Sequence, residues 1–303
     1  MISLKQLRYF DAVARTGHFG KAAEQCAVTQ PALSMQIQDL ERELGTQLLE
    51  RGRKGVILTE SGREIAARAA QVLTDIRDMV DCARRQGSVP SGPLHFGVIP
   101  SIAPYILPPL LPLIREHYPD LDLHLRETQT QHLVRELLEG RLDLLLLGLP
   151  VDDPNIETVR LFDDRFLLAT SKARPIAKNV RATPRMLERD RLLLLEEGHC
   201  MRDQALAVCN LQRVGNLDTT GASSLSTIVQ MVANGHGITL LPELSLDVES
   251  RHGAIQVIPF AEPQPRRIIG LAWRRSSPRK RHFVELGKLI TAVGAKRTAG
   301  GKR

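Results

Sequence analysis

The feature that most constrains the fold is the segment 61–86, which contains no proline and no glycine after Gly62. It predicts one long helix, and at about 1.5 Å per residue this helix extends for roughly 39 Å, more than packing against one small domain requires. Apolar residues recur along it at steps of four and three, the spacing of a pairing seam: Ile65, Ala69, Val72, Ile76, Met79 and Ala83. We therefore expect a linker helix that pairs two copies of the chain. The alternative is a helix packed against its own domain.

Glycine and proline divide the first 60 residues into short helices. Leu4 to Arg15 has apolar residues at helical spacing and is broken at Gly17, and residues 20–27 form a second, alanine-rich helix. A third helix is expected to begin at Thr29-Gln30-Pro31, where a polar cap precedes a proline in the first turn, and to stop at Gly45. Two short helices with a tight connection predict a helix-turn-helix, whose second helix enters the major groove of DNA.

The third helix has an apolar face and a polar face. The apolar face carries Leu33, Ile37, Leu40 and Leu44, and the other face shows the amides and hydroxyl of Gln30, Ser34, Gln36 and Gln38. The segment from Leu48 to Leu58 then has a basic tip, Arg51-Gly52-Arg53-Lys54-Gly55, between apolar flanks, which predicts a β-wing. Residues 1–60 are therefore expected to form an all-α winged helix-turn-helix DNA-binding domain, with 61–86 as the linker and dimerisation helix.

The pattern changes after a hinge of glycine, serine and proline at 87–93. From Leu94, apolar strands alternate with helices, which is typical of a parallel α/β sheet. A second such unit runs from about Phe166 to Ile258, and Ile268–Arg274, followed by a helix from Pro278 to Val293, returns to the first unit. The expected regulatory domain, 94–303, has two α/β lobes with a ligand cleft between them: lobe I at about 94–163 and 268–293, lobe II at about 164–267.

Composition narrows the function classes. The chain has 303 residues, 43% apolar and 25% charged, which predicts a soluble protein of two or three domains. It shows no apolar run of membrane-spanning length and no secretion signal, and four cysteines in a chain this long fit a reducing compartment, so the cytoplasm is expected. The net charge of +7 comes from residues 266–303, whose 12 basic residues and single acidic one we interpret mainly as a solvated tail. Without a nucleotide-binding glycine loop, a nucleophile elbow or metal-ligand spacing, we expect no enzyme, no cofactor and no metal.

Two of the four cysteines stand nine residues apart, at Cys200 and Cys209. The segment from Met201 to Val208 has the pattern of a helix, so Cys200 is expected at its N-terminus, beside His199, where the helix dipole and nearby positive charge favour a thiolate. A thiolate of this kind attacks a peroxide oxygen and becomes a sulfenic acid, which a second thiol converts to a disulfide. The alternative is an inert buried thiol.

The spacing of the two cysteines makes this reaction a switch if the segment is helical. Nine residues of α-helix rise about 13.5 Å, whereas a disulfide needs Cα atoms within about 7 Å. Oxidation would then unwind the helix and could reorganise an adjacent dimer interface. A segment that is already looped before oxidation would weaken this hypothesis.

Over nearly its whole length the chain resembles the LysR-type transcriptional regulators. The family's helix-turn-helix pattern is carried by GKAAEQCAVTQPALSMQIQDLERELGTQLLER. Within the family, LEEGHCMRDQALAVC (Leu195 to Cys209) looks like the peroxide-sensing OxyR branch, supported by GVIPSIAPYILP, ETQTQHL, GITLLP and PRRIIGL. The resemblance implies a winged helix-turn-helix, a linker helix and a two-lobed effector domain like a periplasmic binding protein.

The resemblance also implies roles for single residues. Cys200 would be the peroxide-reactive cysteine and Cys209 its resolving partner, and the peroxide pocket would consist of Ser101 (where the branch usually has threonine), Thr130, His199 and Arg267. On the DNA side, the recognition helix would use Thr29, Gln30, Pro31 and Ser34, and the wing would hold phosphates with Arg51 and Arg53. Gln38-Asp39 stands where the family often has basic residues, which puts the phosphate affinity or base preference in doubt.

The partners implied are double-stranded DNA at dyad-symmetric promoter sites, hydrogen peroxide as the signal, RNA polymerase, and further copies of the chain in a homodimer or homotetramer, with no membrane. The resemblance implies that the chain activates the transcription of oxidative-stress genes. One alternative is a metabolite-responsive regulator of the same family that binds a small acid in the interlobe cleft, which would not need Cys200 and Cys209. Another is a two-lobed solute-binding protein or enzyme, which would leave the first 60 residues unexplained.

Overall fold

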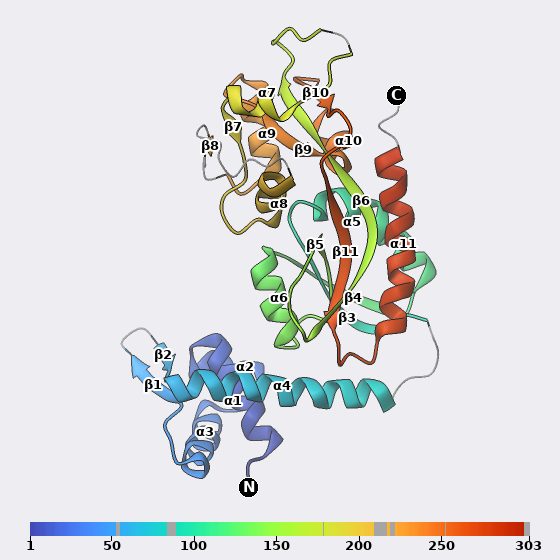
Figure 1. The fold of residues 1–303 in the computed structure, drawn as a ribbon. Helices are drawn as coiled ribbons and strands as arrows, with labels where there is room; N and C mark the ends of the chain where they lie inside the picture. The colour runs from blue at the N-terminus through green and yellow to red at the C-terminus, as the bar shows by residue number, and fades with distance from the viewer. Residues whose placement is uncertain are drawn as a thin grey trace. The chain divides into compact units, whose positions relative to one another are not determined.

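The computed structural model describes residues 1–52, 55–83, 89–177, 179–208, 217–218, 222–251 and 253–299 (Figure 1). The chain divides into two compact units. The N-terminal unit comprises Met1–Gln86 with Leu138–Gly140, and the C-terminal unit comprises Gly87–Leu137 with Arg141–Arg303.

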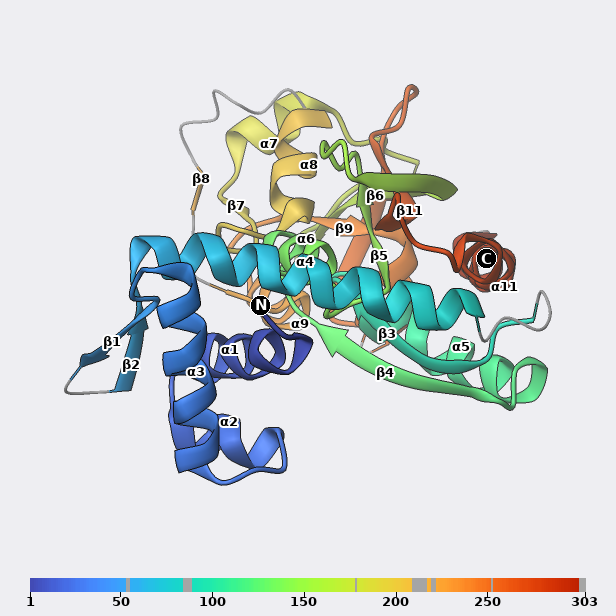
Figure 2. The same cartoon turned by 90° about the horizontal axis from the view of Figure 1, so that it is seen from below.

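The N-terminal unit consists of short helices, a hairpin and one long helix (Figure 2). Its elements are α1 (Leu4–Thr16), α2 (Phe19–Gln25), α3 (Gln30–Leu44), β1 (Leu49–Gly52), β2 (Gly55–Leu58) and α4 (Glu60–Ala83). Strands β1 and β2 pair antiparallel as the expected wing. The second helix begins at Phe19 because the ring Nδ1 of His18 accepts hydrogen bonds from the amides of Gly20 and Lys21 at 3.0 and 3.4 Å.

Glycines end two helices of this unit, and a shared core buries one face of each helix. Gly17 and Gly45 end α1 and α3 in the left-handed region, with φ of +62° and +67°. Helices α1, α2 and α3 pack around a cluster that includes Phe10, Val13, Leu33, Ile37, Leu40 and Leu48. The predicted apolar face of α3 is thus buried, and its opposite face is left for a partner.

The long helix α4 serves two roles along its length. Ala69 is buried in the core of the N-terminal unit, and Ile65 packs against that core. Farther along, Val72 and Met79 are exposed, Met79 by 64%. The first half of the predicted seam is therefore occupied within the chain's own domain, and pairing through the second half stays a prediction.

The C-terminal unit is built on a sheet of seven strands ordered β10-β6-β11-β5-β3-β4, with β9 also paired to β6. Its elements are β3 (Gly92–Val98), α5 (Ala103–His117), β4 (Leu121–Glu127), α6 (Thr130–Leu138), β5 (Leu144–Leu149), β6 (Ile156–Ser171), α7 (Pro184–Arg189), β7 (Leu192–Leu193), α8 (Cys200–Val208), β8 (Leu217–Asp218), α9 (Leu225–Ala233), β9 (Thr239–Pro242), the 3₁₀ helix η1 (Glu243–Ser245), α10 (Leu246–Glu249), β10 (Ile255–Pro259), β11 (Arg266–Arg274) and α11 (Lys280–Ala299). The final helix extends to Ala299, past the expected end at Val293.

Two lobes arise because β6 is long enough to serve both parts of the sheet. Its first residues pair with β11, which returns beside β5 as expected, while its last residues pair with β9 and β10 (Figure 1). In lobe I, β3 pairs parallel with β4 and β5. In lobe II the expectation of parallel strands is wrong for the main sheet, since β9 and β10 both run antiparallel to β6. The alternation of strands and helices predicts where strands occur but not the direction in which each one pairs.

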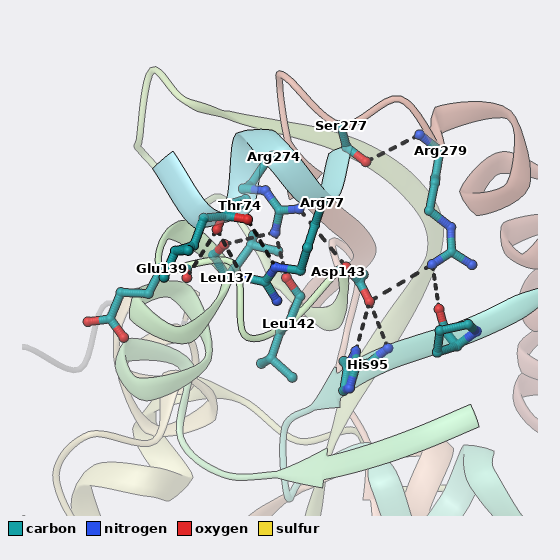
Figure 3. A network of polar contacts seen from close by, with 12 residues as sticks. Thr74, Arg77, His95, Leu137, Glu139, Leu142, Asp143, Arg274, Ser277 and Arg279 are labelled. Atoms are coloured by element: carbon teal, nitrogen blue, oxygen red, sulfur yellow. Dashed lines mark hydrogen bonds and ion pairs between the residues drawn. The ribbon is translucent and has the colours of Figure 1, made fainter. Parts of the chain in front are cut away.

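A polar network fixes the start of β3 in lobe I (Figure 3). The Asp143 carboxylate accepts the His95 amide at 2.9 Å and lies 3.2 Å from the ring Nδ1 of His95. Burial acts to raise the pKa of Asp143, but the hydrogen bonds from His95 and the charge of Arg279 lower it below its ordinary value. Arg279 also donates to the carbonyls of Pro93 and Ser91 at 2.6 and 3.0 Å. The strand that follows the hinge is thereby tied to the beginning of α11.

Candidate redox site and nucleic-acid interface

The candidate redox site begins where a buried strand passes into α8. Leu192–Leu193 form β7, and the chain then turns through Gly198 to reach Cys200, the first residue of α8. Cys200 is half-buried and is not in a disulfide. The sequence left open whether this segment is helical, and the structure resolves it as a helix over Cys200–Val208.

Contacts on both sides hold α8 against lobe I. Gly198 has φ of +91°, and a Cβ at this position would lie 2.7 Å from Oε1 of Gln129, the residue before α6. On the other side, Nε2 of Gln204 donates to the carbonyl of Leu149 at 3.1 Å, at the end of β5. The close approach of Gly198 to Gln129 brings the turn before Cys200 next to the turn before Thr130. The first residues of α8 and α6 therefore lie in one region.

Two of the predicted pocket residues have buried polar atoms in this region. Oγ1 of Thr130 and Nε2 of His199 have no hydrogen-bond partner among the described residues. Oε1 of Glu196 lies 3.9 Å from Nε2 of His199, beyond hydrogen-bonding distance. Burial lowers the pKa of His199, and the charge of Glu196 opposes this shift only in part. The ring is therefore held neutral at physiological pH.

The other two predicted pocket residues, Ser101 and Arg267, bond directly to each other. Arg267 donates to Oγ of Ser101 at 2.8 Å and to its carbonyl at 3.1 Å. Its Nε donates to Asp164 at 2.9 Å, and the side chains of this ion pair are fully buried. The second oxygen of Asp164 accepts the Leu244 amide at 2.9 Å. Complete burial raises the pKa of Asp164 above its ordinary value, and the charge of Arg267 offsets part of this rise.

These bonds place the predicted pocket residue Arg267 in a buried ion pair beside Ser101. Arg267 and Asp164 face each other across the β11–β6 ladder, next to the point where β6 passes from one lobe to the other. The guanidinium thus joins the Ser101 loop of lobe I to Asp164, which in turn holds η1 of lobe II. Sequence reasoning missed Asp164 because nothing local links residues so far apart in the chain.

The remaining cysteines differ in their surroundings. Cys26 packs against the core of the N-terminal unit, whereas Cys82 on α4 is exposed. Cys209, the predicted resolving cysteine, lies outside the described residues. Within the described part of the chain there is no cluster of three or more histidine, cysteine or acidic side chains that could bind a metal ion.

The predicted DNA-binding residues lie on α3 and the wing. Thr29, Gln30 and Pro31 are exposed at the start of α3, and Ser34 is half-buried one turn later. Arg51 belongs to β1, and Arg53 lies outside the described residues. The hairpin is joined to α3 by Glu41, whose carboxylate accepts hydrogen bonds from the amides of Leu48 and Leu49 at 2.8 and 3.1 Å. The sequence did not indicate the exposed Met35, because base readout was expected only from amides and hydroxyls on the outer face of α3.

A winged helix-turn-helix followed by a two-lobed α/β domain defines a bacterial transcriptional regulator whose sensing domain has the architecture of a ligand-binding domain. The family model for bacterial regulatory helix-turn-helix proteins of the lysR family matches residues 4–63, and the LysR substrate binding domain matches residues 87–293. The chain belongs to the LysR family.

Two similar relatives cover nearly the whole chain. The chain is 39% identical to the DNA-binding transcriptional dual regulator OxyR of Escherichia coli K12, with 96% of this chain and 95% of the relative covered. It is 43% identical to a probable hydrogen peroxide-inducible genes activator of Streptomyces viridosporus, with 95% and 93% covered.

Solved structures agree with these relatives. The chain is similar to a full-length OxyR of Pseudomonas aeruginosa with a cysteine-to-aspartate substitution, with 36% identity, a TM-score of 0.81, and 96% and 95% of the two chains covered. An OxyR mutant of Corynebacterium glutamicum with hydrogen peroxide bound has 34% identity and a TM-score of 0.67, with 98% and 96% covered. In the described part of the chain, no helix is both long enough and apolar enough to cross a bilayer.

Proposed function

We propose that this chain is a DNA-binding transcriptional regulator that senses hydrogen peroxide by oxidation of Cys200 and formation of a disulfide with Cys209. The observation that carries the proposal is the position of Cys200 at the first turn of α8, next to His199 with its buried Nε2 and in the same region as Thr130. The names of the relatives, which refer to hydrogen peroxide and to DNA-binding regulation, support the same function.

The chemistry takes two steps. The Cys200 thiolate attacks one oxygen of hydrogen peroxide: an S–O bond forms, the O–O bond breaks, and the departing hydroxide takes up a proton to leave as water. The Cys209 thiolate then attacks the sulfenic sulfur: an S–S bond forms, the S–O bond breaks, and the hydroxyl leaves as a second water after protonation. Two thiols are oxidised by two electrons in all, and one peroxide is reduced to two waters.

The buried polar atoms suit a ligand that is small and both donates and accepts hydrogen bonds. The neutral His199 ring can accept or donate at Nε2, and the Thr130 hydroxyl can do both. Hydrogen peroxide would satisfy both atoms, which otherwise carry the cost of burial without a partner. In this proposal Arg267 is a positioning residue, because its donors hold Ser101 and Asp164.

The helical form of α8 makes the disulfide a conformational switch, wherever Cys209 lies. The eight steps from Cys200 to Val208 rise about 12 Å along the helix. One further peptide link spans about 3.8 Å. The two cysteine Cα atoms are thus at least about 8 Å apart while α8 is intact, and a disulfide needs about 7 Å or less. Oxidation therefore has to unwind part of α8.

The output and assembly follow from the N-terminal unit. Gln30 and Ser34 would read base edges in the major groove at a dyad-symmetric promoter, with Arg51 and Arg53 on phosphates. The exposed part of the α4 seam would pair two copies of the chain in the cytoplasm, as a homodimer or homotetramer that acts on RNA polymerase.

Mass spectrometry of the full chain tests the sensor. After brief exposure to micromolar peroxide, we expect a Cys200–Cys209 linked peptide and loss of two thiols. Cys200→Ser should form no linked peptide and should show no loss of thiols. Cys209→Ser should still be labelled at Cys200 by a sulfenic-acid trap. The matched control is Cys82→Ser, which removes an exposed thiol and should respond like the wild type. Trap labelling at Cys209 in Cys200→Ser, with none at Cys200 in Cys209→Ser, would reverse the roles. No linkage in the wild type would refute the proposal.

A further inference from the structure

Met35 is a large apolar side chain exposed on the recognition helix. It lies in the second turn of α3 with 57% of its surface accessible to solvent. Because more than half of Met35 stays in water, packing within the N-terminal unit accounts for only part of this side chain. Its position along α3 places it among the residues that would face DNA.

The geometry of α3 puts Met35 opposite the core. Successive residues of an α-helix are rotated by about 100°, so Leu33, Ile37 and Leu40 all point to within about 30° of one common direction, and these three are buried. Met35 points about 170° away from their mean. Its neighbours on the same outer stripe are Pro31, Gln38 and Arg42, all of which are exposed or partly exposed. Met35 therefore lies at the centre of the outward face.

We propose that Met35 determines sequence specificity by contacting the C5 methyl group of a thymine in the major groove of double-stranded DNA. This inference rests on the proposed function as a DNA-binding regulator and adds to it one residue and the base that it recognises.

The chemistry of the outer stripe favours a methyl group over a polar base edge. A thioether donates no hydrogen bond, and the thymine methyl is the one apolar group that a base pair presents in the major groove. An unbranched methionine also adapts its shape to a surface better than a branched side chain does.

The test uses the full chain and a pool of random DNA duplexes. Sites enriched by the wild type are resynthesised with each thymine replaced in turn by deoxyuridine, which differs only by the missing methyl group. At one thymine per half-site we expect the wild type to lose about fourfold in affinity, from about 0.8 kcal/mol per buried methyl-sized group. Met35→Ala should bind the thymine and uracil probes equally, and Met35→Leu should keep most of the difference.

Two controls make the outcome specific. Leu4→Ala removes another exposed apolar side chain of the same domain, 48% accessible and outside α3, and it should still distinguish the two probes. The salt dependence of binding should be the same for Met35→Ala and the wild type, since no phosphate contact is lost.

The two proposals fail in different ways. Enriched sites that show no uracil effect, or an effect that persists in Met35→Ala, would overturn the role of Met35 and leave the DNA-binding regulator standing. If the wild type enriches no duplex in either redox state, both the DNA-binding function and this inference are wrong.

Discussion

Breaking the Arg267–Asp164 ion pair should be among the most damaging single changes in the C-terminal unit. Arg267→Met keeps an unbranched side chain but leaves Asp164 as a fully buried carboxylate whose remaining bond is from the Leu244 amide. Removing one partner of a buried pair costs about 3–5 kcal/mol. For a unit of about 200 residues, each kcal/mol shifts Tm by about 2–4 °C, so we expect a loss of about 6–20 °C.

The assay can use the chain's single tryptophan. Trp273 is buried on β11, the strand that carries Arg267, so its fluorescence reports unfolding of this unit. Arg267→Met combined with Asp164→Leu should recover most of the lost stability, because no buried charge is left without a partner. Lys288→Met, which breaks an exposed ion pair with Glu285 on α11, should cost less than about 1 kcal/mol. An Arg267→Met variant within 1 kcal/mol of the wild type would refute this reasoning.

Three further outcomes are expected. Gly198→Ala should lose about 1–2 kcal/mol of stability because φ is positive at this position, and it should slow oxidation by peroxide because the added Cβ displaces Gln129. The control Gly235→Ala also has a positive φ but open space around it, so it should show only the stability loss. Unfolding assays measure the stability, and stopped-flow assays measure the oxidation rate. Since the pKa of His199 is lowered in the folded state, the stability that this residue contributes is complete above about pH 6.5 and is lost as the pH falls through the folded pKa. Unfolding curves of His199→Gln, measured against pH, should lack this loss. A variant with the pH profile of the wild type would show that His199 is not the group responsible. Met79→Glu on the exposed part of α4 should shift sedimentation from dimer toward monomer, while Asp75→Ala should not, and a variant that sediments like the wild type would show that α4 does not pair.

The sequence predicted the elements that depend on local signals. The bounds of α3 followed from the cap at Thr29-Gln30-Pro31 and the stop at Gly45. The position of Cys200 at the start of α8 followed from the helical pattern of Met201 to Val208. The direction of the strands in lobe II was not predictable, because it depends on how β9 and β10, which are distant in sequence, approach the last residues of β6. The Arg267–Asp164 pair was missed for the same reason, as it joins residues that only the folded sheet brings together.

In the proposed mechanism, the predicted pocket residues lie in two parts of the C-terminal unit that differ in stability. Ser101 is fixed by the buried guanidinium of Arg267. Helix α8 and the turn before it carry three buried side-chain atoms without a hydrogen-bond partner among the described residues: His199 Nε2, Arg202 Nε and Gln204 Oε1. Such groups lower the stability of the helix relative to an unwound form in which they reach water. A disulfide contributes about 2–4 kcal/mol, which is comparable to the cost of leaving two such groups unsatisfied. Breaking the Arg267 pair costs about 3–5 kcal/mol, which is on average more than a disulfide supplies. Oxidation should therefore displace α8 and leave the Ser101 loop in place, which is the asymmetry that a switch with one moving element requires.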